Sequence, residues 1–472
     1  MTDRQNRFLE GPINKVLISL AVPIILTNIL QSAYQLTDAF WVGRLGASEV
    51  AAVSVSMPVT FLVIALGSGL AMAGATLSAQ YMGAGRRDKV NHVAAQTMLM
   101  VAVTSAVLGF TGYLLSPYFL TLLGVSEKVY DDALKFMHVS FIGVIFVFLF
   151  AMFQSLMRGI GQIKIPLMIV FGTVILNFFL DPLFIFGLGS FEGLGVMGAA
   201  LATLVTQSIA AILGLTVFMR GRHGIQLEWH NFKPDFAYIK RAFFLGVPGS
   251  VELSARALGM IILSFLVASF GTVTIASYGV GSNLLQFVMI PAMGLSMAVS
   301  TLVGQNIGAN QIERAEKITL LGTLWGFLGL TVIGIVFYVF APHLIAVFIP
   351  DDPEVIQEGA HFLRTMCLTW GGIGVQLCVV SAFRASGNMQ NAMMVALVSQ
   401  WMVQFPLAYV LSKHTALQDN GIWWSFAVTN VVVAIFAFCW FNRGTWKKTR
   451  LTEEEQQIVH ITDEALIEKG NQ

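Results

Sequence analysis

Apolar runs long enough to cross a lipid bilayer recur along almost the whole chain, and this feature limits the possible folds more than any other. A spanning helix needs about 20 mostly apolar residues at 1.5 Å per residue. The runs reach that length and are separated by short polar breaks. Only 11% of the 472 residues are charged, against roughly 25% in an ordinary soluble domain. The sequence therefore predicts an all-α integral membrane protein.

The runs predict about twelve transmembrane helices. Their approximate centres are Leu26, Leu62, Val101, Phe146, Val174, Ile209, Met260, Met289, Trp325, Ile373, Val398 and Val432. The first run follows basic residues, as a signal peptide does, but it is too long and has no small-residue cleavage site. We therefore take it as the first spanning helix.

The basic residues lie mainly in alternate breaks between the runs. With a cytoplasmic N-terminus, the outer breaks hold few of them, namely Arg44, Lys128 and Lys413. Such an uneven distribution follows the positive-inside rule and places both termini in the cytoplasm of a bacterial cell, with the protein in its inner membrane. A net charge of +1 and dispersed basic residues favour no nucleic-acid partner.

The chain contains an internal repeat, which appears when the sequence is shifted by 225 positions against itself. The matching segments are Leu20–Pro23 with Leu245–Pro248, Gly69–Ala73 with Gly294–Ala298, and Gly83–Ala84 with Gly308–Ala309. One position further out of register, Ser155–Gly161 matches Ser381–Gly387. A duplication of this length predicts two lobes of about six helices each, related by a pseudo-two-fold axis along the membrane normal.

The predicted organisation has four parts: an N-terminal lobe over 1–218, a cytoplasmic linker over 219–241, a C-terminal lobe over 242–442 and a cytoplasmic tail over 443–472. The glycine-containing linker is predicted to act as a hinge between the lobes. One chain supplies both lobes, so we expect a monomer in the lipid bilayer. In the tail, Thr452 and Glu455 have the spacing of a helix capping box.

Few ionisable side chains lie inside the predicted spans, where each costs about 2.5 to 3.5 kcal/mol at the bilayer centre. The first span carries Gln31, Tyr34 and Asp38 at intervals of three or four, which places them on one helical face. The fifth span carries Asn177 and Asp181 four residues apart. A polar face of this kind avoids lipid, so these side chains are the predicted functional site.

Other spans add Thr203 and Gln154 to the candidate residues. Carboxylate, amide, hydroxyl and phenol groups can hold a proton or a small hard cation. Sodium is therefore a possible ligand of Asp38, Asn177 and Asp181, and we expect no resident metal or organic cofactor. The repeat places Leu263 opposite Asp38, so the acidic site is predicted in the N-terminal lobe alone.

Two prolines lie near this polar face. Pro23 removes a backbone hydrogen bond from the first span and is the predicted hinge. Pro182 follows Asp181 directly and is predicted to move it away from ideal helical geometry.

Other interpretations of the charged residues remain open. Asp38 could simply end the first helix at the membrane surface, and Asp181 could belong to the following loop. Glu252 and Arg256, four residues apart in the seventh span, could form a structural or gating pair, or they could contact the substrate together with Gln154.

At these residues the chain resembles the multidrug and toxic compound extrusion (MATE) family, and within it the DinF-like branch. The resemblance extends over essentially the whole chain and is carried by Pro23–Gly46, Gln80–Ala84 and Asn177–Gly187. It implies that Asp38 is the main coupling residue. It also implies that Gln31, Tyr34, Asn177, Asp181 and Thr203 complete the cation site. The NorM-like branch has functional acids in the C-terminal lobe, and this chain departs from that pattern.

The predicted function is secondary active export of small amphipathic or cationic organic compounds in exchange for protons or sodium. An alternative is a lipid or lipid-linked precursor flippase, which would be expected to carry more basic residues in its cavity than Arg256. A more remote alternative is an intramembrane aspartyl protease with a carboxylate dyad, but the residues before Asp38 and Asp181 do not fit that motif. The glycines Gly67, Gly69 and Gly74 fit no nucleotide-binding motif.

Overall fold

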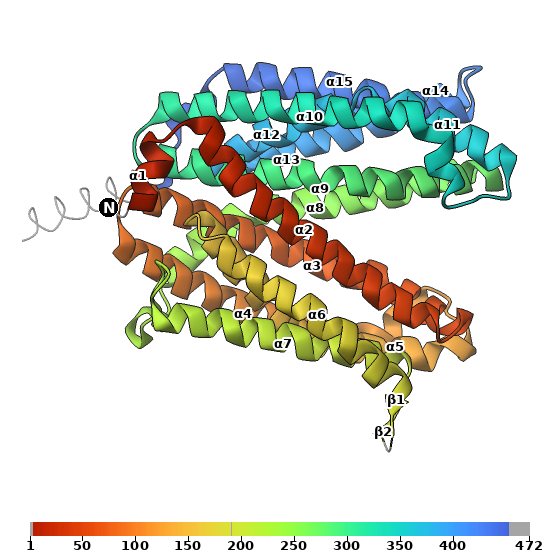
Figure 1. Cartoon of the computed structure of the whole chain (residues 1–472), viewed down its shortest axis with the longest axis horizontal. Helices are drawn as coiled ribbons and strands as arrows, with labels where there is room; N and C mark the ends of the chain where they lie inside the picture. Colours follow the sequence, from red (N-terminus) through yellow and green to blue (C-terminus); the bar gives the residue numbers. More distant parts are fainter. Residues whose placement is uncertain (1–2, 190, 453–472) are drawn as a thin grey trace, which may run out of the picture. The chain divides into compact units, whose positions relative to one another are not determined.

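The protein is a bundle of long helices in a computed structural model that describes residues 3–189 and 191–452 (Figure 1). The helices of the N-terminal half are α1 (Asp3–Glu10), α2 (Ile13–Gly43), α3 (Ala47–Gly83), α4 (Arg87–Leu122), α5 (Glu127–Gly159), α6 (Lys164–Phe186) and α7 (Val196–Arg220). Strands β1 (Gly187–Leu188) and β2 (Phe191–Glu192) form a small antiparallel hairpin between α6 and α7, with Gly187 paired to Glu192.

The C-terminal half contains α8 (Phe236–Ala268), α9 (Thr272–Gly308), α10 (Ile312–Ala346), α11 (Pro353–Cys367), α12 (Trp370–Ser386) and α15 (Asp419–Asn442). Helices α13 (Met389–Leu397) and α14 (Phe405–Lys413) are joined without a break by the π-helical turns of η2 (Val398–Gln404). Short 3-10 turns form η1 (Trp229–Phe232) and η3 (Thr445–Lys448). The capping box predicted at Thr452 and Glu455 extends beyond the described residues.

Eleven helices of the described chain are long and apolar enough to cross a membrane. The pair α11 and α12 is bent by 49° at a short break and provides a twelfth span. Each of the twelve predicted centres falls in a different one of these spans. The prediction of an all-helical multi-pass membrane protein is therefore confirmed.

The repeat is visible in the backbone as well as in the sequence. Residues that the shift places together adopt positive φ angles after equivalent helices: Gly46 (146°) with Gly271 (110°), Gly85 (75°) with Asn310 (63°), and Gly161 (77°) with Gly387 (92°). Asparagine tolerates the left-handed region better than most other residues, which explains how Asn310 can stand where the first half has glycine. The duplicated halves thus keep the same turns although most side chains differ.

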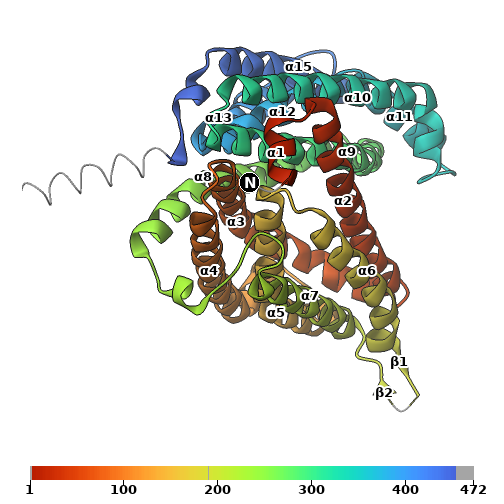
Figure 2. The ribbon, with the colours of Figure 1, turned by 60° about the vertical axis from the view of Figure 1, so that its left-hand side comes forward.

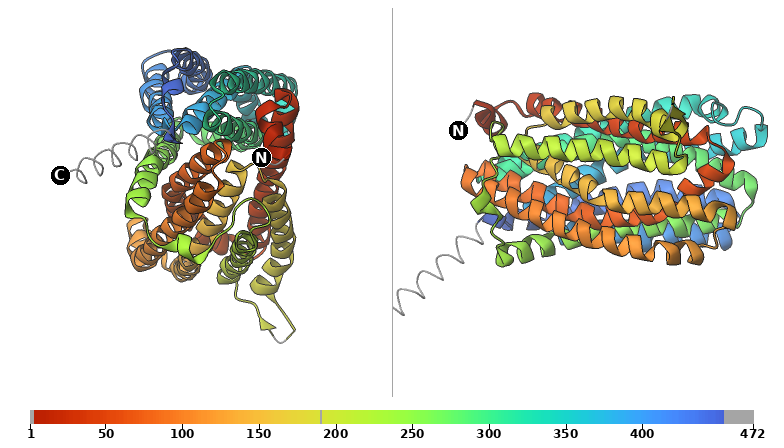
Figure 3. Two further views of the ribbon diagram at one scale, coloured as in Figure 1. Left: turned by 90° about the vertical axis from the view of Figure 1, so that its left-hand side faces the viewer. Right: turned by 90° about the horizontal axis from the view of Figure 1, so that it is seen from below.

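The described chain divides into two compact units. Unit 2 contains Pro23–Ser78 and Arg86–Val251. Within it α4 packs on α5, α5 on α7, and α7 on α6, and this order can be followed in Figures 2 and 3. Unit 1 contains Met1–Val22, Ala79–Gly85 and Glu252–Gln472. Its apolar core comes from α8, α9, α10, α11, α12, α14 and α15 and is centred on Trp370, Trp423 and Phe362.

The unit boundaries run through helices and differ from the predicted lobe boundaries. One boundary crosses α2 between Val22 and Pro23, and another crosses α8 between Val251 and Glu252. The predicted linker 219–241 is also shorter in the structure, because α7 continues to Arg220 and α8 begins at Phe236.

Gln96 of α4 holds the linker in place. Its buried amide donates to the carbonyl oxygens of Asn231 (2.7 Å) and Lys233 (2.8 Å) and accepts from the backbone N–H of Asp235 (3.0 Å). The linker is therefore fastened to α4 within unit 2, and its role as a hinge between the lobes stays a prediction.

Two glycines of the repeat allow α3 and α9 to cross at backbone contact inside unit 1. A Cβ atom on Gly83 would lie 1.9 Å from the carbonyl oxygen of Gln305, and one on Gly308 would lie 1.9 Å from that of Gln80. The side chain of Gln80 is itself buried and donates to the carbonyl oxygen of Ala385 (2.7 Å). The crossing is reciprocal, since each helix places its glycine against the glutamine backbone of the other.

We predict that Gly308→Ala lowers the free energy of unfolding by at least 1–3 kcal/mol, the usual range for overpacking, because the new methyl group would meet backbone. Thermal denaturation of the purified protein in detergent measures this effect. Gly329→Ala in α10 is the matched control, since a Cβ there meets nothing within 4 Å. Equal stability of the two variants would show that α3 and α9 can move apart at the crossing without loss of stability.

Candidate functional site: a polar column in unit 2

The predicted polar residues lie on three neighbouring helices of unit 2 and form successive layers. Asp38 of α2, Asp181 of α6 and Thr203 of α7 make one layer. One turn away, Tyr34 of α2, Asn177 of α6 and Thr206 of α7 make the next. A shift of three or four residues along a helix keeps side chains on one face. The spacing read from the sequence therefore builds a polar column in three dimensions.

The acid layer is held by hydrogen bonds from its neighbours. Thr203 Oγ1 donates to Asp38 Oδ2 (3.3 Å), and Asn177 Nδ2 donates to Asp181 Oδ1 (3.0 Å). The carboxyl groups of Asp38 and Asp181 lie close enough to interact directly, and Asn177 lies beside Asp38 as well. Asp181 and Asn177 are both fully buried. Two acids from different helices are thus brought to one place.

Among the described residues, three buried oxygen atoms in and beside the acid layer have no hydrogen-bond partner: Asp38 Oδ1, Asn177 Oδ1 and Asp181 Oδ2. A buried acceptor without a partner costs about 1–3 kcal/mol, and more when it is charged. All three are acceptors of the hard oxygen type, so a proton shared by the carboxyl groups or a small cation would satisfy them. The residues therefore fit either coupling ion.

Tyr34 and the two glutamines extend the column away from the acids. The Tyr34 hydroxyl hydrogen-bonds Thr206 Oγ1 at 2.6 Å, and Gln31 Nε2 donates to Gln154 Oε1 of α5 at 3.2 Å. Tyr34 and Thr206 are buried, whereas Gln31 is exposed. The column is therefore fully buried at Asp181, half-buried at Asp38 and exposed at Gln31.

An apolar cluster closes the other end of the column. Val42, Ile185 and Ala199 are buried against one another. Each lies four residues from Asp38, Asp181 or Thr203 on the same helix, which is one turn. The Trp41 ring adds edge contacts to Phe178 (5.9 Å) and Phe186 (6.2 Å). Water is thus excluded from the acids on this side.

The helix ends decide between the alternative interpretations of the two acids. Helix α2 continues past Asp38 to Gly43, and α6 continues through Pro182 to Phe186. Asp38 therefore does not end its helix, and Asp181 does not lie in a loop. The predicted departure of Asp181 from helical geometry is wrong, because α6 absorbs the proline. Pro23 also lies within a continuous α2, and its carbonyl oxygen accepts from Thr27 Oγ1 (2.9 Å).

Glu252 and Arg256 lie in the other unit and are not part of this column. They contact each other at 3.4 Å, and Arg384 of α12 contacts the same carboxylate at 2.6 Å. Sequence spacing could identify the i, i+4 pair but not Arg384, which is 132 residues away. Thr206 was noted beside Thr203 in the sequence but was not assigned to the predicted site. Its position three residues after Thr203 was the available signal.

Comparison with known proteins identifies the family of this chain. The MatE family model matches residues 23–183 and again 248–410. The chain belongs to the MatE family. The two matched segments begin 225 positions apart, which is the shift of the internal repeat. The family prediction is thereby confirmed, and a MatE protein is a transporter rather than an enzyme.

Relatives of this MatE protein cover nearly all of its length. It is 29% identical over 436 residues to the probable multidrug resistance protein YoeA of Bacillus subtilis, covering 91% of this chain and 94% of the relative. It is 25% identical to a Shewanella oneidensis protein named FAD transporter, covering 93% and 96%. The crystal structure of the Vibrio cholerae MATE transporter VcmN in the bent form superposes with a TM-score of 0.84 at 22% identity, covering 91% and 96%. The last comparison supports the fold alone.

A double-mutant cycle tests the second layer of the column. We expect Tyr34→Phe and Thr206→Val each to reduce stability by about 1 kcal/mol, and the double variant to lose less than the sum, because both remove one buried hydrogen bond. The matched control pairs Tyr34→Phe with Thr216→Val, since Thr216 bonds only its own helix at Ile212. That pair should be additive, and additivity in both pairs would reject the Tyr34–Thr206 bond.

Proposed function

We propose that this MatE protein is a secondary active exporter of small amphipathic organic molecules, driven by a proton that binds at the Asp38–Asp181 pair. The observation that carries the proposal is the set of three buried acceptor oxygens without partners, at Asp38, Asn177 and Asp181. The protein is placed in the bacterial cytoplasmic membrane with both termini in the cytoplasm, in agreement with the positive-inside rule.

The proton acts by changing the charge of the acid layer. With a proton between the carboxyl groups, one acid donates where both previously accepted, and the mutual repulsion of two carboxylates is removed. Helices α2 and α6 carry these acids, so their separation responds to the change. The apolar cluster of Val42, Ile185 and Ala199 prevents water from screening it.

Pro23 offers a place where α2 can bend in response. Proline donates no backbone hydrogen bond to the preceding turn, and kinks in helices concentrate at such residues. The boundary between the compact units lies next to Pro23. We propose that α2 bends here when the acid layer takes up a proton, and that the bend reduces the space available to the exported molecule.

Sodium is the alternative coupling ion, because carboxylate and amide oxygens bind small hard cations too. Transport driven separately by a pH gradient and by a sodium gradient would distinguish the two ions. For a neutral substrate, one proton moving down a 100 mV potential supplies about 2.3 kcal/mol, enough for roughly a fiftyfold gradient at about 1.4 kcal/mol per tenfold.

A second candidate is export of a molecule that carries phosphate, including a lipid-linked precursor. The relative named FAD transporter supports it, because FAD contains a diphosphate. The structure adds Arg384 to Arg256 as a second basic side chain of the C-terminal helices. The remote protease alternative has no such support, since the family is one of transporters.

We predict that Asp38→Asn and Asp181→Asn each lower pH-driven uptake of a fluorescent cationic dye into inverted vesicles at least tenfold, because the amide cannot take up the coupling proton. Asp351→Asn is the matched control, since this exposed aspartate lies between α10 and α11. It should retain the wild-type rate. Wild-type uptake by Asp38→Asn would remove this residue from the coupling mechanism.

We also predict that Pro23→Ala slows transport several-fold without lowering thermal stability, because the restored backbone hydrogen bond stiffens α2. Pro58→Ala in α3 is the control, as Pro58 also lies inside a helix of unit 2. The same loss of rate in both variants would show that the effect is not specific to Pro23.

A further inference from the structure

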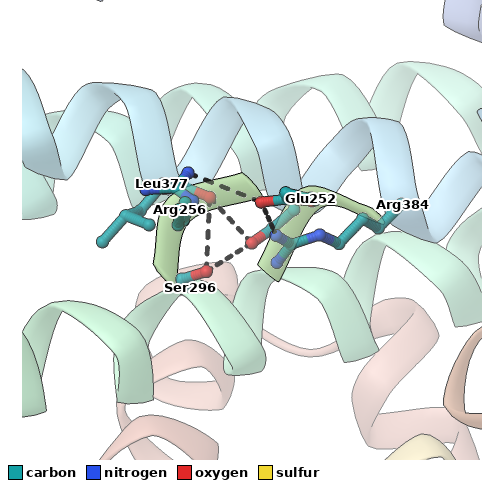
Figure 4. Close-up of polar contacts among 6 residues, drawn as sticks. Glu252, Arg256, Ser296, Leu377 and Arg384 are labelled. Atoms are coloured by element: carbon teal, nitrogen blue, oxygen red, sulfur yellow. Dashed lines mark hydrogen bonds and ion pairs between the residues drawn. The ribbon is translucent and has the colours of Figure 1, made fainter. Parts of the chain in front are cut away.

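A charged triad lies within the helices of unit 1, at a distance along the chain from every residue of the polar column. Glu252 and Arg256 belong to α8, and Arg384 belongs to α12 (Figure 4). Glu252 is 1% exposed, whereas the side chains of Arg384 and Arg256 are 18% and 30% exposed. The carboxylate is therefore the buried member, and the two guanidinium groups surround it.

The carboxylate is shared unequally between the two arginines. Both contacts reach the same oxygen, Glu252 Oε1, at 2.6 Å from Arg384 and 3.4 Å from Arg256. Charge-assisted hydrogen bonds are usually 2.7–2.9 Å long, so the Arg256 contact is weak. Among the described residues, Glu252 is the only acid paired with Arg256. One carboxylate cannot neutralise two guanidinium groups, so the positive charge of Arg256 is left largely uncompensated.

From its position in the span we infer that the charge of Arg256 faces water. Arg256 lies well inside the span Phe236–Ala268, and its side chain is nearly one-third exposed. An arginine that faced hydrocarbon at this depth would cost several kcal/mol, and charged residues within spans normally face the bundle interior or a water-filled cavity. The exposed part of Arg256 is therefore accessible to a polar solute.

A hydroxyl network lies between α9 and α12, one turn before Arg384. Ser296 Oγ and Ser381 Oγ share a hydrogen bond of 2.5 Å, and both lie within hydrogen-bond distance of the carbonyl oxygen of Leu377 (3.2 and 2.8 Å). Figure 4 shows the contacts of Leu377 with Ser296 and those of Glu252 with its two arginines. The second oxygen of the carboxylate, Glu252 Oε2, is buried without a hydrogen-bond partner. Because Arg384 makes the short contact with Glu252 and Arg256 the long one, we infer that Arg256 is the member able to change partner.

We propose that Arg256 binds an anionic group of the exported molecule, a carboxylate, sulfonate or phosphate, and that Glu252 and Arg384 position it. The guanidinium group presents paired N–H donors that match such oxyanions. The proposal rests on the proposed export function only in naming the anion as part of a substrate. It predicts a preference for amphipathic molecules that carry an acid group.

Binding of two dyes that differ by one carboxylate tests the proposal. Rhodamine 19 is the free acid of rhodamine 6G, which is its ethyl ester, so both share one fluorophore. Fluorescence anisotropy with the purified full-length protein in neutral detergent, without an ion gradient, gives both dissociation constants. We expect the wild-type protein to bind the acid at least tenfold more tightly than the ester. Equal affinities would overturn the proposal.

Substitutions then assign the preference to Arg256. Arg256→Gln should abolish the tenfold preference and leave the affinity for the ester unchanged, whereas Arg256→Lys should retain part of it. Arg364→Gln is the matched control, because Arg364 also lies in unit 1 and its side chain donates to the Tyr338 carbonyl oxygen and lies over the Tyr338 ring. An equal loss of affinity for both dyes in Arg256→Gln would indicate a structural or gating role and would reject the proposed anion site.

Lipid headgroups carry the same oxyanion chemistry, and a competition arm separates them from solutes. The wild-type measurement is repeated in nanodiscs of phosphatidylcholine with and without phosphatidylglycerol. An unchanged preference supports a solute site, while its loss in the anionic lipid assigns Arg256 to headgroups and overturns the substrate assignment. Binding needs no proton coupling, so failure of Asp38→Asn to block transport would leave this result intact.

Discussion

The fold of unit 2 is arranged around buried oxygen atoms that need a hydrogen-bond partner and cannot obtain one from water. Hydrocarbon offers no hydrogen bonds, so polar groups in a membrane must be satisfied within the protein. Most are: Tyr34 bonds Thr206, and Asn177 bonds Asp181. The acceptors left over are concentrated in the acid layer, one turn beneath the apolar cluster of Val42, Ile185 and Ala199. Buried acceptors without a hydrogen-bond partner raise the free energy of the folded protein, and a bound cation would satisfy them.

The duplication explains the scaffold but not the chemistry. Both halves keep the positive-φ turns and the glycines that let α3 and α9 cross, because these depend on backbone geometry that few side chains can replace. The repeat counterpart of Asp38 is Leu263, which is packed in the apolar core of unit 1. Unit 1 instead carries the triad centred on Glu252. The two halves share one backbone arrangement, but one carries an excess of acidic groups within its helices and the other an excess of basic groups.

The sequence was sufficient to predict the spans, the repeat and most of the acid layer, since each depends on local periodicity. Apolar runs of helical length predict spans, and intervals of three or four residues predict a shared face, so Tyr34 and Asp38 could be assigned without a structure. The contacts between helices could not be. Arg384 of α12 contacts Glu252 of α8, and no spacing along the chain encodes this contact. The fastening of the linker by Gln96 and the continuity of α6 through Pro182 likewise depend on tertiary packing that overrides local signals.

The membrane potential offers a reason why a proton site at the acid pair would be combined with an anion site at the charged triad. An exporter that admits one proton moves one positive charge inward for a neutral or zwitterionic substrate, at about 2.3 kcal/mol per 100 mV. A singly cationic substrate cancels that movement and leaves only the pH difference to drive export. A singly anionic substrate doubles it to roughly 4.6 kcal/mol, or about two-thousandfold at 1.4 kcal/mol per tenfold. An exporter with a proton site at Asp38 and Asp181 therefore gains the most driving force from substrates with an acid group, the substrates that Arg256 would select.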